Sequence, residues 1–259
     1  MRRMNISDLY AAPKQVDDLE SCVFYHTIDL PNSETVWGHV DLRGRERAYL
    51  GGVDLEGKTV LEVGPATGHL AFFMEQHGAT VTCLELPHSD VGDLVPRIDL
   101  ENWDQILADR RRHLDQIVNG FWYCHGKLTS KIQVIYGTVD DLVEAGATFD
   151  FVVLGGVLLH LRDLQLRLQQ FASLARQEII VTEQLLAPLD RSDSAPIVWL
   201  APSKGNEVWD HWWRFGPGYF SGYLPILGFP DLKVTKHEQS CLGNMFKHFT
   251  IRGRRNIKV

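Results

Sequence analysis

The segment VLEVGPATG, residues 60–68, constrains the fold of this chain more than any other part of the sequence. An apolar, β-rich run that ends at Val63 predicts a buried strand, and it passes directly into a glycine turn. The residues after the turn have the character of a helix that ends at Gly78. Gly64 allows the chain to turn sharply where a side chain would collide. The segment therefore predicts a strand, a tight turn and a helix, an arrangement that binds ligands in open α/β sheets.

The rest of the chain continues this alternation of strands and helices. We predict strands at residues 22–30, 59–63, 79–86, 131–136, 149–154, 178–182, 232–237 and 245–251, and helices at 68–77, 102–120 and 161–174. Runs of β-branched residues between helices are typical of a parallel sheet with helices on both faces. The last two strands can pair antiparallel through a connection that contains Gly243. We therefore predict an α/β, Rossmann-like doubly wound sheet, mostly parallel, with an antiparallel C-terminal hairpin.

Three segments do not follow the alternation. We divide the chain into an N-terminal extension, residues 1–50, and one domain, residues 51–259, with insertions at 88–130 and 185–222. A chain of 259 residues can bury roughly 70–75% of its extended surface, so it needs no disulfide or metal to fold. The extension and the insertions are expected to cover the site that the sheet forms.

Charge and cysteine content exclude several classes of protein. The formal net charge of −7 gives no electrostatic case for nucleic acid. The four cysteines include no CxxC pair, so neither a zinc site nor a disulfide framework is predicted. No stretch approaches the ~18 apolar residues of a membrane span, and the N-terminus lacks the apolar run of a signal peptide. A cytoplasmic protein with reduced thiols and no membrane contact is expected.

Carboxylates flank the glycine turn. Glu62 lies two residues before Gly64, while Ala66 stands where the dinucleotide fingerprint G-x-G-x-x-G requires a glycine. Glu85 ends the next predicted strand, where a carboxylate can accept both hydroxyls of a ribose. The form E-x-G-x-x-x-G resembles motif I of class I S-adenosylmethionine (SAM) methyltransferases, and the resemblance is clear over residues 57–183. The alternative is an ordinary α/β turn followed by a chance glutamate.

The resemblance implies SAM as the cofactor and S-adenosylhomocysteine (SAH) as its product. In the family, the acid at Glu62 lies near the methionine amino group, and the acid at Glu85 holds the ribose. The residues implied in cofactor binding are Glu62, Gly64, Pro65, Ala66, Gly68, Glu85, Leu86, Thr138, Val139, Gly155 and Gly156. Thr138 and Val139 would flank the adenine, although a loop that caps the next helix explains them equally well.

Methyl transfer from a sulfonium is an in-line displacement, which needs a base only when the acceptor must lose a proton. His160, beyond the fourth parallel strand, is the candidate base, and a packed or capping histidine is the alternative. Glu183 ends the fifth strand and could orient an acceptor or cap the next segment. Candidate acceptor-binding residues are Tyr25, Trp37, His39, Tyr123, Trp209, Trp212 and Arg214. No pair of His or Cys residues has convincing metal spacing, so we expect no metal.

Three functions fit these features. The first is a SAM-dependent methyltransferase that acts on a small molecule, as a monomer or homodimer. The second is methylation or carboxymethylation of the wobble uridine of transfer RNA. The chain is similar to the family of enzymes with that function at Gly57-Lys58, at GGVLLH after strand four and at VTE at the end of strand five. That function needs a basic surface, and the chain is acidic. The third is a non-catalytic SAM-binding partner protein, which would bind SAM without turnover.

Overall fold

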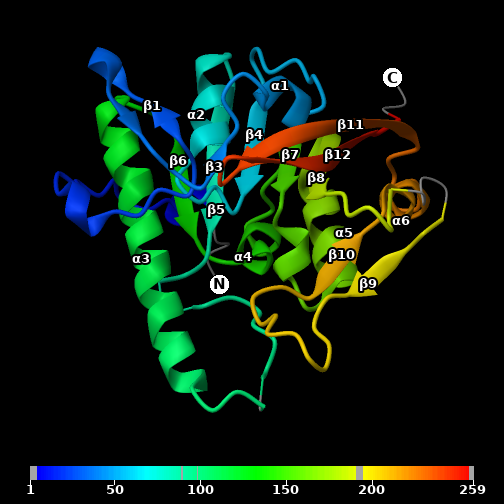
Figure 1. The fold of residues 1–259 in the computed structure, drawn as a ribbon. Helices are drawn as coiled ribbons and strands as arrows, with labels where there is room; N and C mark the ends of the chain where they lie inside the picture. Colours follow the sequence, from blue (N-terminus) through cyan, green and yellow to red (C-terminus); the bar gives the residue numbers. More distant parts are fainter. Residues whose placement is uncertain (1–4, 89, 98, 191–194, 257–259) are drawn as a thin grey trace.

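The computed structural model of the chain describes residues 5–88, 90–97, 99–190 and 195–256. Among these residues, the central sheet has eight strands in the order β3-β11-β12-β8-β7-β4-β5-β6 (Figure 1). The strands are β3 (Val40–Asp41), β4 (Thr59–Val63), β5 (Thr80–Glu85), β6 (Gln133–Tyr136), β7 (Phe149–Gly155), β8 (Ala175–Gln184), β11 (Asp231–Cys241) and β12 (Asn244–Arg254). The five strands from β6 to β8 are parallel, whereas β12, β11 and β3 are antiparallel to their neighbours. The predicted Rossmann-like sheet and its C-terminal hairpin are confirmed.

Helices cover both faces of this sheet. They are α1 (Glu46–Tyr49), α2 (His69–Gln76), α3 (Trp103–Lys127), α4 (Val139–Glu144), α5 (Leu164–Leu174) and α6 (Pro217–Tyr223). One hydrophobic cluster joins the sheet to α4, α5 and α6, and the other joins it to α1, α2 and α3. Short strands form two small separate sheets, one of β1 (Ile28–Asp29) with β2 (Thr35–Val36) and one of β9 (Val198–Leu200) with β10 (Trp213–Phe215). The part of the chain that the structure describes also has four single turns of 3-10 helix: η1 (Ile6–Asp8), η2 (Leu19–Ser21), η3 (Pro31–Ser33) and η4 (Leu158–His160).

The alternation of side chains along β4 explains its apolar sequence and the place of Glu62. Val60 and Leu61 are both fully buried, but they belong to the two different hydrophobic clusters. Successive side chains of a strand point to opposite faces, so a strand covered on both faces must be apolar throughout. Glu62 shares the face of Val60, toward α1, α2 and α3. The one acidic residue of β4 therefore points into a packed layer rather than into solvent.

Two predictions about local structure are wrong. The helix expected to end at Gly120 continues to Lys127. Gly120 instead provides room for the N-terminal extension, because a Cβ there would lie 2.7 Å from the carbonyl oxygen of Val23. The strand expected over residues 22–30 is limited to β1, since Val23 donates its backbone N–H to Gln116 of α3 rather than to another strand.

The N-terminal extension reaches both edges of the sheet. The backbone N–H of Ala11 donates to Val134 of β6 over 2.8 Å, and β3 pairs with β11 at the opposite edge. In Figure 1, α3 of the first insertion runs alongside the sheet, whereas β9 and β10 of the second insertion lie below the parallel strands. No described helix is both long and apolar enough to cross a bilayer. Residues 1–4, part of the predicted extension, lie outside the described residues, as do positions 89, 98 and 191–194 of the insertions.

Candidate active site

The turn after β4 brings the backbone close to the carboxyl edge of the sheet. Gly64 has φ of 66°, and its N–H donates to Leu84 of β5 over 2.9 Å. Ala66, where the related methyltransferases usually have glycine, also lies in the left-handed region with φ of 49°. A side chain in that region costs about 1–2 kcal/mol. Alanine is therefore tolerated here at a cost that glycine would avoid.

Glu62 lies directly under this turn and is only 4% exposed. Its Oε2 atom has no hydrogen-bond partner among the described residues. Burial, with a smaller contribution from the charge of Glu85, raises the pKa of Glu62 to about 8. A buried carboxyl group with an unused oxygen is costly unless a ligand completes its hydrogen bonds. The residue thus fits a cationic ligand group such as an ammonium.

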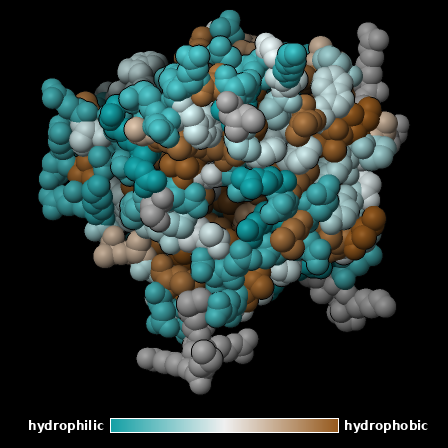
Figure 2. Space-filling view, turned by 90° about the horizontal axis from the view of Figure 1, so that it is seen from below, coloured by the Kyte–Doolittle hydropathy of each residue, from teal (hydrophilic) through white to brown (hydrophobic). Residues whose placement is uncertain are grey.

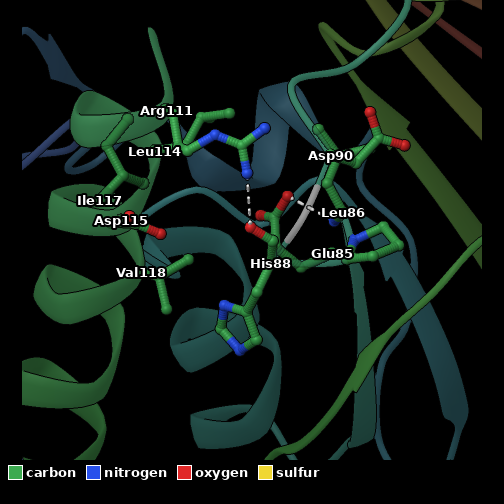
Figure 3. A pocket seen from close by; sticks show the side chains of 10 residues that line it. Glu85, Leu86, His88, Asp90, Arg111, Leu114, Asp115, Ile117 and Val118 are labelled. Atoms are coloured by element: carbon green, nitrogen blue, oxygen red, sulfur yellow. Dashed lines mark hydrogen bonds between the residues drawn. The ribbon is translucent and has the colours of Figure 1, made fainter. Parts of the chain in front are cut away.

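Glu85 separates two adjoining pockets at the ends of β5 and β6. Figure 3 shows the outer pocket, where Glu85 Oε1 accepts a 2.8 Å hydrogen bond from the backbone N–H of Leu86. The wall opposite is α3, and Val118 of that helix lines both pockets. The inner pocket is lined by Pro65, Ala66, Glu85, Val118, Phe121, Val134 and Tyr136. Apolar side chains beside one carboxylate match the chemistry of a nucleoside, whose ring is apolar on its faces and whose ribose offers hydroxyls to an acid.

Tyr49 covers the end of β7, and the sequence offered no sign of this role. A Cβ on Gly155 would lie 2.9 Å from Cε1 of Tyr49, so only glycine fits beneath the ring. The carbonyl oxygen of Tyr49 accepts hydrogen bonds from the hydroxyls of Thr182 (2.7 Å) and Thr250 (2.9 Å). The phenol interacts electrostatically with both Glu62 and Glu183. Tyr49 therefore closes the space between the turn after β4 and the end of β8.

Glu183 is the second buried carboxyl group of this space. It is 2% exposed, and its Oε1 has no hydrogen-bond partner among the described residues. Burial raises the pKa of Glu183 to about 8, and the positive charge of Arg214 opposes this rise. The group is therefore mostly protonated at neutral pH and becomes a base only above it.

His160 lies half-buried beside the same space. Its Nδ1 is hydrogen-bonded to the carbonyl oxygen of Asp210, so Nδ1 carries the proton and Nε2 holds the free lone pair. Burial lowers the pKa of His160, and the nearby cation Arg110 contributes in the same direction. The imidazole is accordingly neutral, with one nitrogen committed to the segment that contains Asp210.

Electrostatic interactions link the groups around this space into a closed series. It runs from Glu62 through Glu85, Arg110, Asp210, Arg214, Glu183 and Tyr49 back to Glu62. We call the region that contains these seven residues and His160, near the carboxyl ends of the strands, the acceptor chamber. The face of the molecule seen from below has a hollow near its centre, surrounded largely by hydrophilic residues (Figure 2).

The two insertions meet to form a lid over the chamber. Val95 donates its backbone N–H to Trp209 over 2.8 Å, and Arg97 Nη1 donates to the carbonyl oxygens of Asn206 (2.6 Å) and Val208 (3.1 Å). Trp212 joins this layer to η4 through its backbone N–H, which donates to Leu159 over 2.7 Å. Segments from 93–97 and 206–212 are thus held together where they cross the ends of the strands.

The structure brings only some of the expected acceptor residues to the chamber. Arg214 lies beside Glu183, and Tyr25 interacts electrostatically with Glu183 and Asp210. Trp209 and Trp212 form the lid, where the indole of Trp212 donates to the carbonyl oxygen of Asp93.

The other expected acceptor residues have partners elsewhere. Trp37 is 72% exposed and lies against Arg43, while His39 is exposed. Tyr123 donates to Glu34 and lies beneath Lys127. Of the residues expected to flank the adenine, Thr138 forms a capping box with Asp141 at the start of α4, and Val139 is buried in the core. Within the described part of the chain, no three His, Cys, Asp or Glu side chains are grouped so that they could hold a metal ion.

The strand order, the glycine turn and the carboxyl groups at Glu62 and Glu85 define a class I SAM-dependent methyltransferase. Residues 39–218 match the family described as "Methyltransferase domain", so the chain belongs to that family, and the expected enzyme class is confirmed. The donor in this class is SAM. No curated protein sequence matches the chain.

Several solved structures are similar in fold. The N-terminal domain of EvdMO1 with SAH bound has 18% identity and a TM-score of 0.48, covering 82% of this chain and 80% of that one. A 1,6-didemethyltoxoflavin-N1-methyltransferase from Burkholderia thailandensis has 13% identity and a TM-score of 0.47, with 81% and 74% covered. A putative RNA methyltransferase from Pyrococcus horikoshii has 15% identity and a TM-score of 0.46, with 82% and 80% covered.

Proposed function

We propose that this methyltransferase transfers the methyl group of SAM to a small-molecule acceptor held in the acceptor chamber. The observation that carries the proposal is the pair of buried carboxyl groups, Glu62 and Glu183, at the ends of β4 and β8. Each has an oxygen without a hydrogen-bond partner among the described residues, and the lid covers both. Because each carboxyl group has an unused oxygen, the arrangement favours binding of two different polar ligands, one at Glu62 and one at Glu183.

Glu62 and Glu85 are proposed to hold the donor from its two ends. Oε2 of Glu62 would accept a hydrogen bond from the methionine ammonium, and Glu85 would accept from the ribose hydroxyls. The inner pocket between Ala66, Val118 and Tyr136 would enclose the adenine. When bound, SAM supplies an electrophilic methyl group on a positively charged sulfur. The turn at Gly64 would place that group between Gly155 and the chamber.

Glu183 is proposed to accept the proton that the acceptor loses. Its unpartnered oxygen provides a site for a hydroxyl or an amine, and its raised pKa makes the carboxylate a stronger base than usual. His160 remains the second candidate through Nε2, since its Nδ1 is bound to Asp210. Tyr49 would exclude water from the reacting atoms by covering the glycines at the end of β7.

The lid and the charge of the chain favour a small molecule over a transfer RNA. The insertions cross the ends of the strands, where an RNA base would have to enter, and the net charge is −7. Binding of RNA depends on neutralisation of its phosphates by Lys and Arg. A cytoplasmic location and a monomeric or homodimeric state stay predictions of the sequence.

The test of the proposed function compares two acceptor pools in the presence of SAM with a labelled methyl group. We expect label in the low-mass fraction of a cell extract and no label in bulk transfer RNA. A gel shift with the same RNA should show no saturable complex. Label in transfer RNA, or saturable binding that weakens steeply with salt, would refute the small-molecule proposal.

A further inference from the structure

Two arginines of the acceptor chamber have no carboxylate partner. Arg110 comes from α3 and Arg214 from β10, and each interacts electrostatically with Asp210. Among the described residues, neither guanidinium has a carboxylate oxygen within the 4.0 Å of an ion pair. Nε of Arg110 is buried without any hydrogen-bond partner. Both arginines are half-buried, and this burial lowers the pKa of each guanidinium.

The acids nearby neutralise these two cations only in part. Asp210 has a pKa of about 2 and is therefore ionised, and it interacts electrostatically with both arginines while its Oδ1 lies 2.7 Å from the imidazole Nδ1 of His211. Glu183 has a raised pKa of about 8 and is mostly uncharged at neutral pH. One aspartate therefore faces two half-buried cations, which leaves an excess of positive charge on the lid side of the chamber. Such charges are costly in a folded protein unless an opposite charge completes the site.

We propose, on the basis of the proposed function, that the acceptor carries an oxyanion, a carboxylate or phosphate group, that binds between Arg110 and Arg214. Guanidinium groups recognise these anions through paired, charge-assisted hydrogen bonds. An acceptor held in this way extends from the lid toward the end of β8, where the free oxygen of Glu183 lies. The two arginines thereby determine which molecules are methylated and how their nucleophile is oriented.

The donor offers a competing anion, its own methionine carboxylate. SAH has the same carboxylate, so protein saturated with SAH has that group already in place. An oxyanion that binds to the SAH-saturated protein must use a different site from the donor carboxylate. The experiment therefore measures binding to the complex and, separately, the affinity for SAH itself.

The test is calorimetric titration of SAH-saturated protein with benzoate, phenyl phosphate and benzamide. Benzamide has the shape of benzoate without its charge. We expect saturable binding of at least one oxyanion and binding of benzamide at least tenfold weaker. The substitutions Arg110→Met and Arg214→Met should each weaken oxyanion binding about tenfold or more while changing SAH affinity less than about twofold. A preference for benzoate or for phenyl phosphate identifies which oxyanion the site prefers.

The matched control is Arg112→Met, an exposed arginine on α3 that is paired with Asp109, and it should leave oxyanion binding unchanged. Arg110→Lys and Arg214→Lys keep the charge, and they should bind the oxyanion better than the Met variants. The proposal is overturned if neither oxyanion binds, if benzamide binds as well, or if the Met variants lose SAH affinity instead. Failure of the wild type to bind SAH would refute the proposed function rather than the anion site.

Discussion

At the scale of single residues, Glu85 is the residue proposed to hold the ribose of the donor. Its side chain separates the two pockets at the end of β5, and its Oε1 is fixed by the backbone N–H of Leu86. Glu85→Ala should weaken SAM binding by about 2–3 kcal/mol, because hydrogen bonds to a charged group are lost. Calorimetry measures this effect. Asp115→Ala removes an exposed acid from the rim of the outer pocket and should change the affinity by less than about twofold. Equal affinities for the wild type and Glu85→Ala would refute the ribose assignment.

The role of Glu183 as base predicts a particular pH dependence. The pKa of Glu183 is about 8 and a base must be deprotonated, so the rate should rise with pH through that value. Glu183→Gln should lower kcat about 10²–10⁴-fold, remove this rise and spare SAH affinity. His160→Gln serves as the comparison: as a positioning residue, it should lower kcat while the rise near pH 8 remains. A Glu183→Gln enzyme with normal turnover would show that positioning alone suffices.

At the scale of elements, the lid depends on the side chain of Arg97. Arg97 bridges the first insertion to the backbone of Asn206 and Val208 in the second. Arg97→Ala should raise the acceptor KM about tenfold, because both hydrogen bonds between the insertions are lost and the lid opens. SAH affinity should hardly change. Lys204 is exposed in the second insertion, so trypsin should cleave there faster in the variant. Unchanged cleavage and KM would contradict this role of the lid.

At the scale of the whole molecule, the buried carboxyl groups predict how stability depends on pH. The pKa of Glu62 and that of Glu183 are about 8 in the folded protein and 4.5 as ordinary values. Between these values the folded chain keeps protons that the unfolded chain has lost, so stability falls as pH rises. Lowered pKa values of His26 (about 3) and His237 (about 4) act in the opposite direction, but only below pH 6.5.

The unfolding temperature of the ligand-free protein should therefore decrease from pH 6.5 to pH 8. The expected slope is about 1.4 kcal/mol per pH unit for each carboxyl group. The double substitution Glu62→Gln and Glu183→Gln imitates the protonated forms, so its unfolding temperature should vary much less over this range. Thermal unfolding at several pH values measures both proteins. An equally steep slope in the double variant would mean that these two groups do not titrate as the structure indicates.

Features that depend on neighbouring residues in the sequence could be predicted, whereas features that depend on contacts between distant residues could not. The turn at Gly64, the strand before it and Glu85 depend on neighbours along the chain, and all were located correctly. Tyr49 was missed because its position is fixed by Thr182 and Thr250, which are far away in sequence. Arg110 belongs to a basic cluster with Arg111 and Arg112, which could bind a phosphate but more often faces solvent, so the burial of Arg110 could not be predicted.

The error at Gly120 has the same cause as these omissions. A glycine after a run of helical spacing is a good local signal for a helix end. The backbone of Val23 crosses α3 at that point, and this contact is invisible to a local pattern. The expected helix limit was therefore wrong although the helix itself was predicted.

The attachment of Tyr49 to Thr250 has a consequence for how the enzyme is completed during its synthesis. The turn after β4 and the strands beside it leave the ribosome early, whereas Thr250 belongs to β12, the last described strand. A domain generally folds as a unit. Until β12 inserts between β8 and β11, Tyr49 has only part of its support over Gly155. A nascent chain would thus lack a closed chamber until its last strand has been made.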